Sequence, residues 1–575
     1  MNAARSGGQV VVDQLVIHGA DLVFCVPGES YLEVLDALYD ARDRIQLVNA
    51  RHEAGAANMA EAYGKLTGRP GIALVTRGPG ACHAAIGVHT AHQDSTPMLL
   101  LIGQIARGRT DREAFQEVDY RQMFGPLAKW VAQIDQADRV PEYLARAFHV
   151  ATSGRPGPVV LALPEDMLTE AVTVADARPF VASQAAPDPA DLARLRGMLE
   201  AAERPILLVG GSRWSDAACA QIVAFAEAWD LPATTSFRRM DVFDNRSPVY
   251  AGDFGTSPLP SLPGRLREAD LVIAVGARLG DITTQDYSTL ARTESRLQSE
   301  GLAETLRTER SPAPQALVHV YPDADELGRV FRPALGIVAG PAAFAAALGA
   351  LRPSAAPSWS AWTRAANADY VANLEPSAYD GALDMGRALA ELRQVLPRDA
   401  IVTLDAGNHT GWPMRYLAFG RPGRLLGPTS GAMGYSAPAA VAASLVHRDR
   451  LVVCCVGDGG FLMSGQEIAT AVQHGGKPIF LVFNNASYGT IRMHQERTHP
   501  GRTIGTDLVN PDFVGLARAY GAHSELVTRT AEFAPAFERA VAAGKAALIE
   551  LRTDPERITT RTTIAALRPA AKRKA

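Results

Sequence analysis

One pattern recurs along the whole chain: a short apolar run ends at Gly or Pro, and a stretch with helical spacing follows it. Between residues 8 and 170 these runs read DLVFCVPG, IQLVNA, GIALVTRGPG, MLLLIGQ and PVVLALPED. Near-continuous apolar runs that alternate with helices are typical of a parallel sheet covered by helices on both faces. The pattern therefore predicts an α/β chain built from doubly wound parallel sheets.

Two Pro- and Ala-rich stretches interrupt this pattern and read as linkers between domains. They divide the 575 residues into three predicted α/β domains, at 8–170, 190–350 and 378–555, followed by a basic tail at 556–575. At ~100–200 residues per domain, this length also predicts about three domains.

Composition excludes several classes of protein. Hydrophobic residues make up 47% and charged residues 21%, which is ordinary globular usage and excludes a disordered chain or a coiled coil. The 57 Lys and Arg residues against 61 Asp and Glu residues argue against general nucleic-acid binding. No apolar run reaches about 18 residues, so we expect no membrane span. Five cysteines without a CxxC spacing, and an N-terminus without a signal peptide, predict reduced thiols and a cytoplasmic location.

The most specific pattern is a GDG triplet at 457–459, followed after 24 residues by an Asn pair at 484–485. Each part follows an apolar run, so both are expected at the carboxyl ends of neighbouring parallel strands, where such sheets bind ligands. The Asp458 carboxylate and the Asn485 amide oxygen are hard ligands suited to Mg²⁺, which usually keeps phosphates in its shell. The glycines up to Gly460 allow backbone N–H groups to reach a phosphate. A capping Asp and an unrelated turn Asn would explain each half alone, but not both at this spacing.

This pattern resembles the thiamine-diphosphate signature of thiamine-dependent 2-oxo-acid enzymes. The resemblance extends over residues 8–550 and is closest to the large subunits of acetohydroxyacid (acetolactate) synthases and their relatives. It implies thiamine diphosphate and Mg²⁺ as cofactors, and three domains: an N-terminal pyrimidine-binding, a central and a C-terminal diphosphate-binding domain. It also implies that Asp458, Asn485 and the Ser487 carbonyl hold the metal.

The family pattern assigns cofactor contacts to further segments. GNH, which ends at His409, matches the diphosphate-binding stretch, and SGAMGYSAPAA matches a loop whose Gly431 carbonyl would accept a hydrogen bond from the cofactor's 4′-amino group. Met433 of this loop would be the apolar wedge that folds the cofactor. The resemblance implies these cofactor-binding residues: Gly80, Gly407, Asn408, His409, Gly431, Met433, Asp458, Gly459, Gly460, Asn485, Ser487, Gly489 and Ile491.

The segment NARHEAGAANMAEAYGKLTG, at 49–68, carries a second strong pattern. Here an apolar run ends at charged residues before a helix of small residues, where a lone Glu would usually be a solvated charge at a helix N-terminus. The match to the family's RHE pattern implies that Glu53 is catalytic and protonates the cofactor's aminopyrimidine at N1′. Such a role calls for burial, since burial disfavours the charged form of a carboxyl group.

The resemblance also implies a substrate pocket. AFQEVDY matches the synthase loop whose Phe115 and Gln116 reach the reaction centre, and Gln116 would be catalytic by hydrogen-bonding an oxygen of the intermediate. Ile491 should line the pocket beside the cofactor. His494 stands where the synthases carry a Trp, which predicts a roomier, more polar pocket and a different acceptor. A further departure is Glu165, which replaces a Lys of the family.

The resemblance leaves FAD binding undecided. The synthases hold a structural FAD through basic residues of the central domain; Arg155 and Arg278 match two of those arginines, whereas a third falls on Ile282. In the family, the first and third domains of two chains enclose the cofactor, which implies a homodimer or homotetramer acting on a small-molecule 2-oxo acid. Whether a regulatory small subunit binds stays open.

A carboligase fits these observations best: it would decarboxylate a 2-oxo acid and join the product to a second carbonyl compound. A non-ligating decarboxylase is disfavoured, because such relatives use an adjacent His pair and a carboxylate just after the residue that matches Ile491. None of the 13 histidines here are adjacent, and Arg492 takes the carboxylate's position. A C–C lyase or hydrolase stays open because of Arg492 and His494. A non-catalytic cofactor-binding protein is disfavoured by the intact acid and metal ligands.

Overall fold

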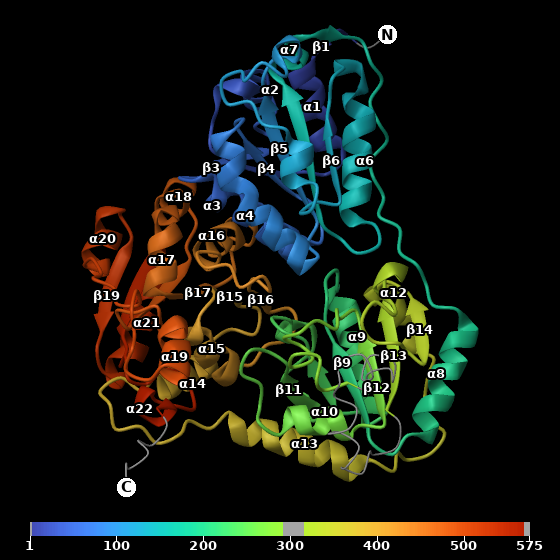
Figure 1. Cartoon of the computed structure of the whole chain (residues 1–575), viewed down its shortest axis with the longest axis vertical. Helices are drawn as coiled ribbons and strands as arrows, with labels where there is room; N and C mark the ends of the chain where they lie inside the picture. The colour runs from blue at the N-terminus through green and yellow to red at the C-terminus, as the bar shows by residue number, and fades with distance from the viewer. Residues whose placement is uncertain (1–2, 291–314, 569–575) are drawn as a thin grey trace.

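The computed structural model describes residues 3–290 and 315–568. Within them, three six-stranded parallel sheets follow one another along the chain, each covered by helices (Figure 1). This confirms the predicted α/β fold of three parallel-sheet domains. A short antiparallel pair, β1 (Arg5–Ser6) and β8 (Ala171–Val172), joins the two ends of the first domain.

The first domain has the strand order β3-β2-β4-β5-β7-β6. Its central strands are fully buried apolar runs, because helices cover both faces of the sheet. The elements are α1 (Gly7–Ile17), β2 (Leu22–Cys25), α2 (Leu32–Asp40), β3 (Gln46–Asn49), α3 (Glu53–Thr67), β4 (Gly71–Val75), α4 (Pro79–Asp94), β5 (Met98–Gln104), α5 (Tyr120–Phe124), β6 (Trp130–Gln133), α6 (Val140–Thr152), β7 (Pro158–Pro164) and α7 (Glu165–Thr169).

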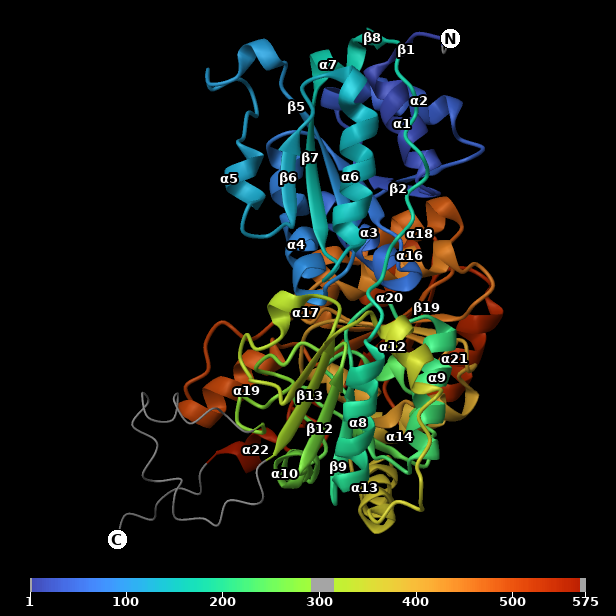
Figure 2. The same ribbon diagram turned by 90° about the vertical axis from the view of Figure 1, so that its right-hand side faces the viewer.

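The second domain has the strand order β11-β10-β9-β12-β13-β14. All strands are parallel, but the side on which successive strands are added changes between β9 and β12. The segment 173–188 reaches it along the outside of the molecule and leads into α8 (Figure 2). The elements are α8 (Pro189–Ala201), β9 (Pro205–Val209), α9 (Asp216–Ala228), β10 (Ala233–Thr235), β11 (Tyr250–Asp253), α10 (Leu262–Glu268), β12 (Leu271–Val275), β13 (Ala316–Tyr321), β14 (Leu335–Val338), α12 (Pro341–Leu348) and α13 (Ser360–Asn373).

The third domain has the order β16-β15-β17-β18-β20-β19. The elements are α14 (Met385–Val395), β15 (Ile401–Leu404), α15 (Gly411–Tyr416), β16 (Arg424–Leu426), α16 (Ser436–Val446), β17 (Val452–Gly457), α17 (Asp458–Ser464), α18 (Ile468–His474), β18 (Ile479–Asn484), α19 (Gly489–Thr498), α20 (Phe513–Ala519), β19 (His523–Val527), α21 (Thr530–Ala542), β20 (Ala547–Arg552) and α22 (Ile564–Leu567).

The first and third domains share one hydrophobic core. Helix α3 packs against α16, and both helices are rich in Ala, which lets their backbones approach closely (Figure 1). Buried residues of both helices belong to a single apolar cluster that continues into both sheets. Burial of apolar surface therefore stabilises the arrangement of these two domains as well as each domain itself.

Arginines from the other two domains bind the carboxyl-terminal ends of α3 and α4. Arg424 of β16 donates hydrogen bonds to the backbone oxygens of Lys65 and Leu66, both at 2.5 Å. Arg239 of the second domain donates to the backbone oxygen of Asp94, at 2.8 Å. These carbonyls are among those that a helix leaves without an internal partner. The first domain's two central helices thus end on side chains supplied by its neighbours.

The described part of the basic tail is docked on the third domain. Arg568 forms a two-point contact with Glu496 of α19, with N···O distances of 2.8 and 2.6 Å. Ile564 of α22 is buried. Across the two described ranges, none of the helices combines the length and the apolar character that a membrane span needs.

Candidate active site

A cavity of about 250 Å³ opens at the carboxyl ends of β15, β17 and β18. Strands that end at one edge of a parallel sheet direct the following loops to the same place. Each cofactor-binding residue predicted in the third domain lines this cavity: Gly407, Asn408, His409, Gly431, Met433, Asp458, Gly459, Gly460, Asn485, Ser487, Gly489 and Ile491.

The predicted metal ligands lie on two adjacent turns of this edge. Asp458 is 3% exposed; its Oδ1 accepts from the Gly459 N–H at 2.9 Å, and its Oδ2 accepts from the Asn510 side chain at 2.8 Å. Burial raises the pKa of Asp458, a cost that a bound cation would offset. Ala486 has a φ of 52°, and this turn brings Asn485 and Ser487 to the cavity together. A carboxylate, an amide oxygen and a backbone carbonyl fit Mg²⁺.

The cavity wall also suits an anionic group. His409 is half-buried, and its Nε2 atom is buried without a hydrogen-bond partner in the described part of the chain. Desolvation lowers the pKa of His409 to about 3, so the ring is neutral and carries one N–H. At Gly460, a Cβ atom would lie only 2.9 Å from Asp405 Oδ2, which explains why the backbone at this turn carries no side chain. These features fit a diphosphate beside the metal ligands.

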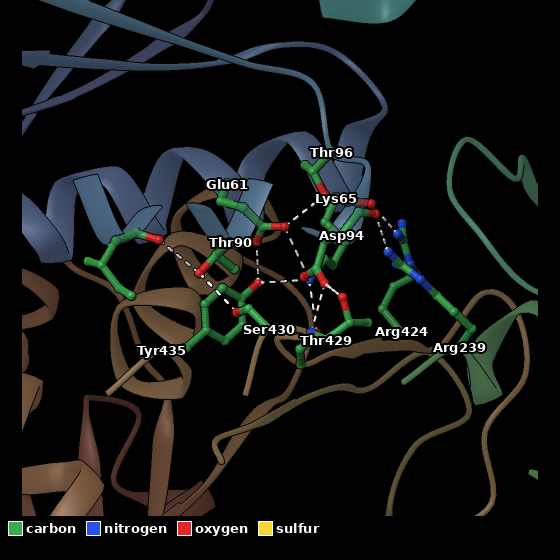
Figure 3. A network of polar contacts seen from close by, with 12 residues as sticks. Glu61, Lys65, Thr90, Asp94, Thr96, Arg239, Arg424, Thr429, Ser430 and Tyr435 are labelled. Carbon is green, nitrogen blue, oxygen red and sulfur yellow. Dashed lines mark hydrogen bonds and ion pairs between the residues drawn. The ribbon is translucent and has the colours of Figure 1, made fainter. Parts of the chain in front are cut away.

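The loop that carries Gly431 and Met433 is held from both sides. Asp405, which follows β15, accepts two hydrogen bonds from the Gly434 N–H, at 2.9 and 3.1 Å. On the opposite side, Asp94 of α4 accepts from the Thr429 N–H at 2.7 Å (Figure 3). Met433 itself is 37% exposed at the cavity.

Glu53 begins helix α3, and a neighbouring histidine binds it. His83 Nδ1 lies 2.8 Å from Glu53 Oε2, while a Cβ at Gly80 would lie 3.5 Å from Glu53 Oε1. The turn before the helix is fixed by Glu467, whose carboxylate accepts from the Arg51 N–H and the His52 N–H at 3.1–3.2 Å. The sequence did not reveal these two partners, because no spacing along the chain pairs His83 or Glu467 with Glu53.

His52, Glu53 and His83 together form a second cluster with metal-binding potential. Their nearest ligand atoms all lie within 4.8 Å of one another. The rings of His52 and His83 lie 4.4 Å apart. Among the described residues, this imidazole-rich set has the spacing to hold a metal ion, apart from the oxygen-rich set around Asp458.

The predicted substrate residues lie on separate domains. Phe115 is 73% exposed, and its backbone oxygen accepts from Arg77 Nε at 3.3 Å. Gln116 follows with a φ of 66° and packs on Gly78. In the third domain, Ile491 lines the cavity and is 53% exposed, and His494 lies one turn later on the exposed face of α19.

A single chain does not bring the predicted cofactor-binding residues of the first domain to those of the third domain. In the described ranges, the residues that line the cavity all fall between 385 and 558. Neither Glu53 nor Gly80, both predicted to contact the cofactor, is among them. The cavity therefore lacks the side that the first domain was expected to supply.

A crevice of the second domain contains part of the set that the resemblance assigns to FAD. It lies at the carboxyl ends of β9 and β12 and contains Arg278 and Ile282. The Arg155 side chain donates instead to Ser95 Oγ at 2.9 Å and to the His92 carbonyl at 2.6 Å. The crevice thus offers one of the three arginines that the resemblance requires.

Comparison with known proteins assigns all three domains. The N-terminal TPP-binding domain of thiamine pyrophosphate enzymes matches residues 5–123, the central domain 192–348, and the C-terminal TPP-binding domain 405–551. The acetolactate synthase large subunit of Parasynechococcus marenigrum is 32% identical over 541 residues, 91% of this chain and 83% of that protein. The acetolactate synthase isozyme 2 large subunit of Escherichia coli is 30% identical over 533 residues, 91% of each chain. A probable acetolactate synthase large subunit of Methanocaldococcus jannaschii is 28% identical over 571 residues, 96% of this chain and 92% of that protein.

Proposed function

This chain belongs to the thiamine pyrophosphate enzymes, and we propose that within them it is an acetolactate-synthase-like carboligase. It is a thiamine-diphosphate-dependent enzyme that decarboxylates a 2-oxo acid and joins the remaining fragment to a second carbonyl compound. The observation that carries this proposal is the cavity of about 250 Å³, in which the metal-ligand, diphosphate and wedge residues converge from four separate segments.

Residues of the third domain hold the cofactor. Asp458, Asn485 and the Ser487 carbonyl would hold Mg²⁺, and His409 would lie against the diphosphate that binds with it. The Gly431 carbonyl would accept a hydrogen bond from the cofactor's 4′-amino group, and Met433 would supply an apolar contact to it. Thiamine diphosphate, when bound, would supply a nucleophilic carbon for the keto group and a sink for the electron pair released with CO₂.

Glu53 governs the proton at the pyrimidine ring. His83 occupies Oε2, so Oε1, beside Gly80, is the oxygen left to hold a proton at N1′. With the cofactor bound, a proton held at N1′ would make the 4′-amino group more acidic, and the imine left when that group gives up a proton would be the base for the thiazolium C–H. Gln116 contributes a hydrogen bond to the reacting oxygen, and Phe115 helps to exclude water.

The active form is at least a homodimer. The cavity lacks residues of its own first domain, while the Glu53 cluster lies elsewhere in the same chain. A second copy that presents its Glu53 to this cavity completes the site and covers the exposed Met433 and Ile491. Sedimentation velocity should show a dimer or tetramer at assay concentration, and full activity of a monomer would contradict this. Since the relatives are named large subunits, a smaller chain is also a candidate partner.

A substrate panel tests the reaction. The protein, with thiamine diphosphate and Mg²⁺, is given single 2-oxo acids with and without a second oxo acid or an aldehyde, and products are identified by mass. We expect CO₂ and a ligated hydroxyketone product that requires the acceptor. Formation of the simple aldehyde alone would assign a non-ligating decarboxylase instead. Glu53→Gln is the matched control for conversion that does not depend on the site.

A further inference from the structure

A cluster of fully buried charges lies where helices α3 and α4 meet the third domain (Figure 3). The Lys65 side chain is 2% exposed and forms ion pairs with Asp94 and, at 3.2 Å, with Glu61. Both carboxylates are completely buried. Buried charges lower stability unless they are paired and hydrogen-bonded, so a cluster of this kind needs each of its partners.

The partners come from one loop of the third domain. Asp94 Oδ1 accepts from the Thr429 N–H at 2.7 Å and also from the Thr429 hydroxyl. Lys65 Nζ donates to the Gly427 carbonyl at 3.0 Å, and the Tyr435 hydroxyl donates to Glu61 at 2.5 Å. One further contact joins the hydroxyls of Thr90 and Ser430, at 3.3 Å (Figure 3).

The same loop carries the residues that enter the cofactor cavity. Between β16 and α16 it contains no helix or strand, so ladder hydrogen bonds do not define its path. Gly431 and Gly434 both have positive φ values, 68° and 81°. The loop's path therefore depends on its anchors, which are Asp405 from its own domain and the buried cluster from the first domain.

We propose that Asp94 is a positioning residue for the cofactor site: with Lys65 and Glu61 it fixes residues 427–435, so that the Gly431 carbonyl and Met433 face the cavity. This inference rests on the proposed function for its chemical consequence. Asp94 does not touch the cavity and acts only through the loop. Burial alone would raise the pKa of Asp94, but Lys65 and Arg239 hold it below the usual value, so the carboxylate that accepts from Thr429 is charged.

Thr429→Val is the sharpest test, because it removes the hydroxyl from Asp94 and leaves the buried charges and the shape of the side chain in place. Without cofactor, amide hydrogen exchange in residues 427–436 should become about tenfold faster, since a hydrogen bond to a charged group is lost. With cofactor, affinity for thiamine diphosphate and kcat should each fall about tenfold, with KM for the 2-oxo acid unchanged. Asp94→Asn should change the same quantities further, but it also leaves Lys65 short of a partner.

Thr152→Val is the matched control. Thr152 is buried in the first domain and, like Thr429, donates a hydrogen bond through its hydroxyl, here to the Phe148 carbonyl at 2.8 Å, far along the chain from the loop. The Thr152→Val variant should leave amide hydrogen exchange at 427–436 and the affinity for thiamine diphosphate unchanged. Unchanged loop exchange in Thr429→Val, or an equal effect of both variants, would overturn the proposal. Failure of the wild-type protein to bind thiamine diphosphate would instead refute the proposed function, while the cofactor-free exchange result would still decide the role of Asp94 in loop position.

Discussion

The first and third domains have the same topology and different chemistry. Numbered within each domain, the strands of both sheets follow the order 2-1-3-4-6-5, whereas the second domain follows 3-2-1-4-5-6. In the third domain, the turn after the third strand carries Asp458, and the turn after the fourth carries Asn485. In the first domain, the turn after the third strand reads Arg77-Gly78-Pro79, and the distinctive acid, Glu53, follows the second strand instead.

The difference shows that the sheet determines where a ligand binds, and the residues at the strand ends determine what it is. The third domain offers oxygen ligands and backbone N–H groups, which suit a metal diphosphate. The first domain offers a carboxyl group bound to an imidazole, which suits proton transfer. The same strand order, used in two domains of this chain, therefore serves two complementary tasks at what we propose is one site shared by two chains.

Removal of the carboxylate proposed to bind Mg²⁺ should have the largest effect on cofactor binding. Asp458→Ala removes the only charged ligand of the proposed Mg²⁺ set, and the diphosphate does not bind well without the metal. Titration calorimetry with thiamine diphosphate and Mg²⁺ should show no binding. Glu538→Ala, on the exposed face of α21, is the control and should bind normally. Wild-type affinity in Asp458→Ala would refute the metal assignment and remove the contrast between the two domains.

Glu53→Gln should separate binding from chemistry. The amide keeps the size of the side chain but supplies no proton to the pyrimidine, so kcat should fall about 10²–10⁴-fold, as for loss of a general acid. Cofactor affinity should change little, because the third domain provides the metal and diphosphate contacts. The two values come from steady-state turnover and calorimetry on the same preparation. Turnover close to wild type would show that the first domain does not supply the acid.

The two carboxylates that anchor the 427–435 loop should respond to pH in opposite directions. Burial raises the pKa of Asp405 to about 6, so the folded state holds its proton more tightly than the unfolded state, and its contribution to stability falls as pH rises from about 4 to 6. This shift corresponds to roughly 3 kcal/mol at most. Asp94, whose pKa is lowered, contributes stability that is lost as pH falls.

Asp405→Asn tests this contrast. Denaturant midpoints measured from pH 4 to pH 7 should decrease less with rising pH in the variant than in the wild-type protein. If the two proteins show parallel pH profiles, Asp405 does not titrate in this range, and the two anchors do not differ in charge.

His494→Trp should change substrate choice. The exposed His494 lies one helical turn beyond Ile491, where an indole would add apolar contact area for an aliphatic acceptor. The wild-type protein should show little preference for 2-oxobutyrate over pyruvate, and the variant should gain about tenfold, the lower end of what one methylene-sized contact provides. Competition between the two oxo acids, scored by the product ratio, measures it. A strong 2-oxobutyrate preference in the wild type would show that another residue selects the acceptor.

His83→Asn should have the smallest effect of the series. It removes the imidazole from Glu53 Oε2 but leaves a polar side chain in its place, so kcat should fall about fivefold, as for one hydrogen bond of ordinary strength. KM and cofactor affinity should not change. An unaltered kcat would mean that Glu53 needs no partner, whereas a loss as large as in Glu53→Gln would give His83 an equal share in the chemistry.

The sequence predicts the interior strands of the first and third sheets better than the strands at their edges. The apolar runs correspond to β2, β4, β5 and β7 and to one edge strand, β3, in the first domain, and to β15, β17, β18 and β20 in the third. The strands without such a run, β6, β16 and β19, lie at the edges of their sheets. An edge strand is covered less, so its residues alternate or are polar, as in HSELV of β19, and no continuous apolar run marks it.

The sequence also predicts some parts of the site and not others, for a different reason. Asp458, Asn485 and His409 belong to short motifs at strand ends, and parallel topology brings such ends together without further information. The contacts of His83 with Glu53, Asn510 with Asp458 and Asp94 with Thr429 join segments 30, 52 and 335 residues apart. No periodicity in the sequence pairs these positions, so only the folded structure reveals the contacts between them.

The arginines at the ends of α3 and α4 limit how freely this domain can be exchanged. Its sheet is complete and its linker is exposed, which would usually suggest a portable module. Yet Arg424 and Arg239, which bind the last carbonyls of these helices, are encoded more than 140 residues downstream of them. A chimera that joins this first domain to the remainder of a related enzyme should therefore fold well only when both arginines are transferred with it.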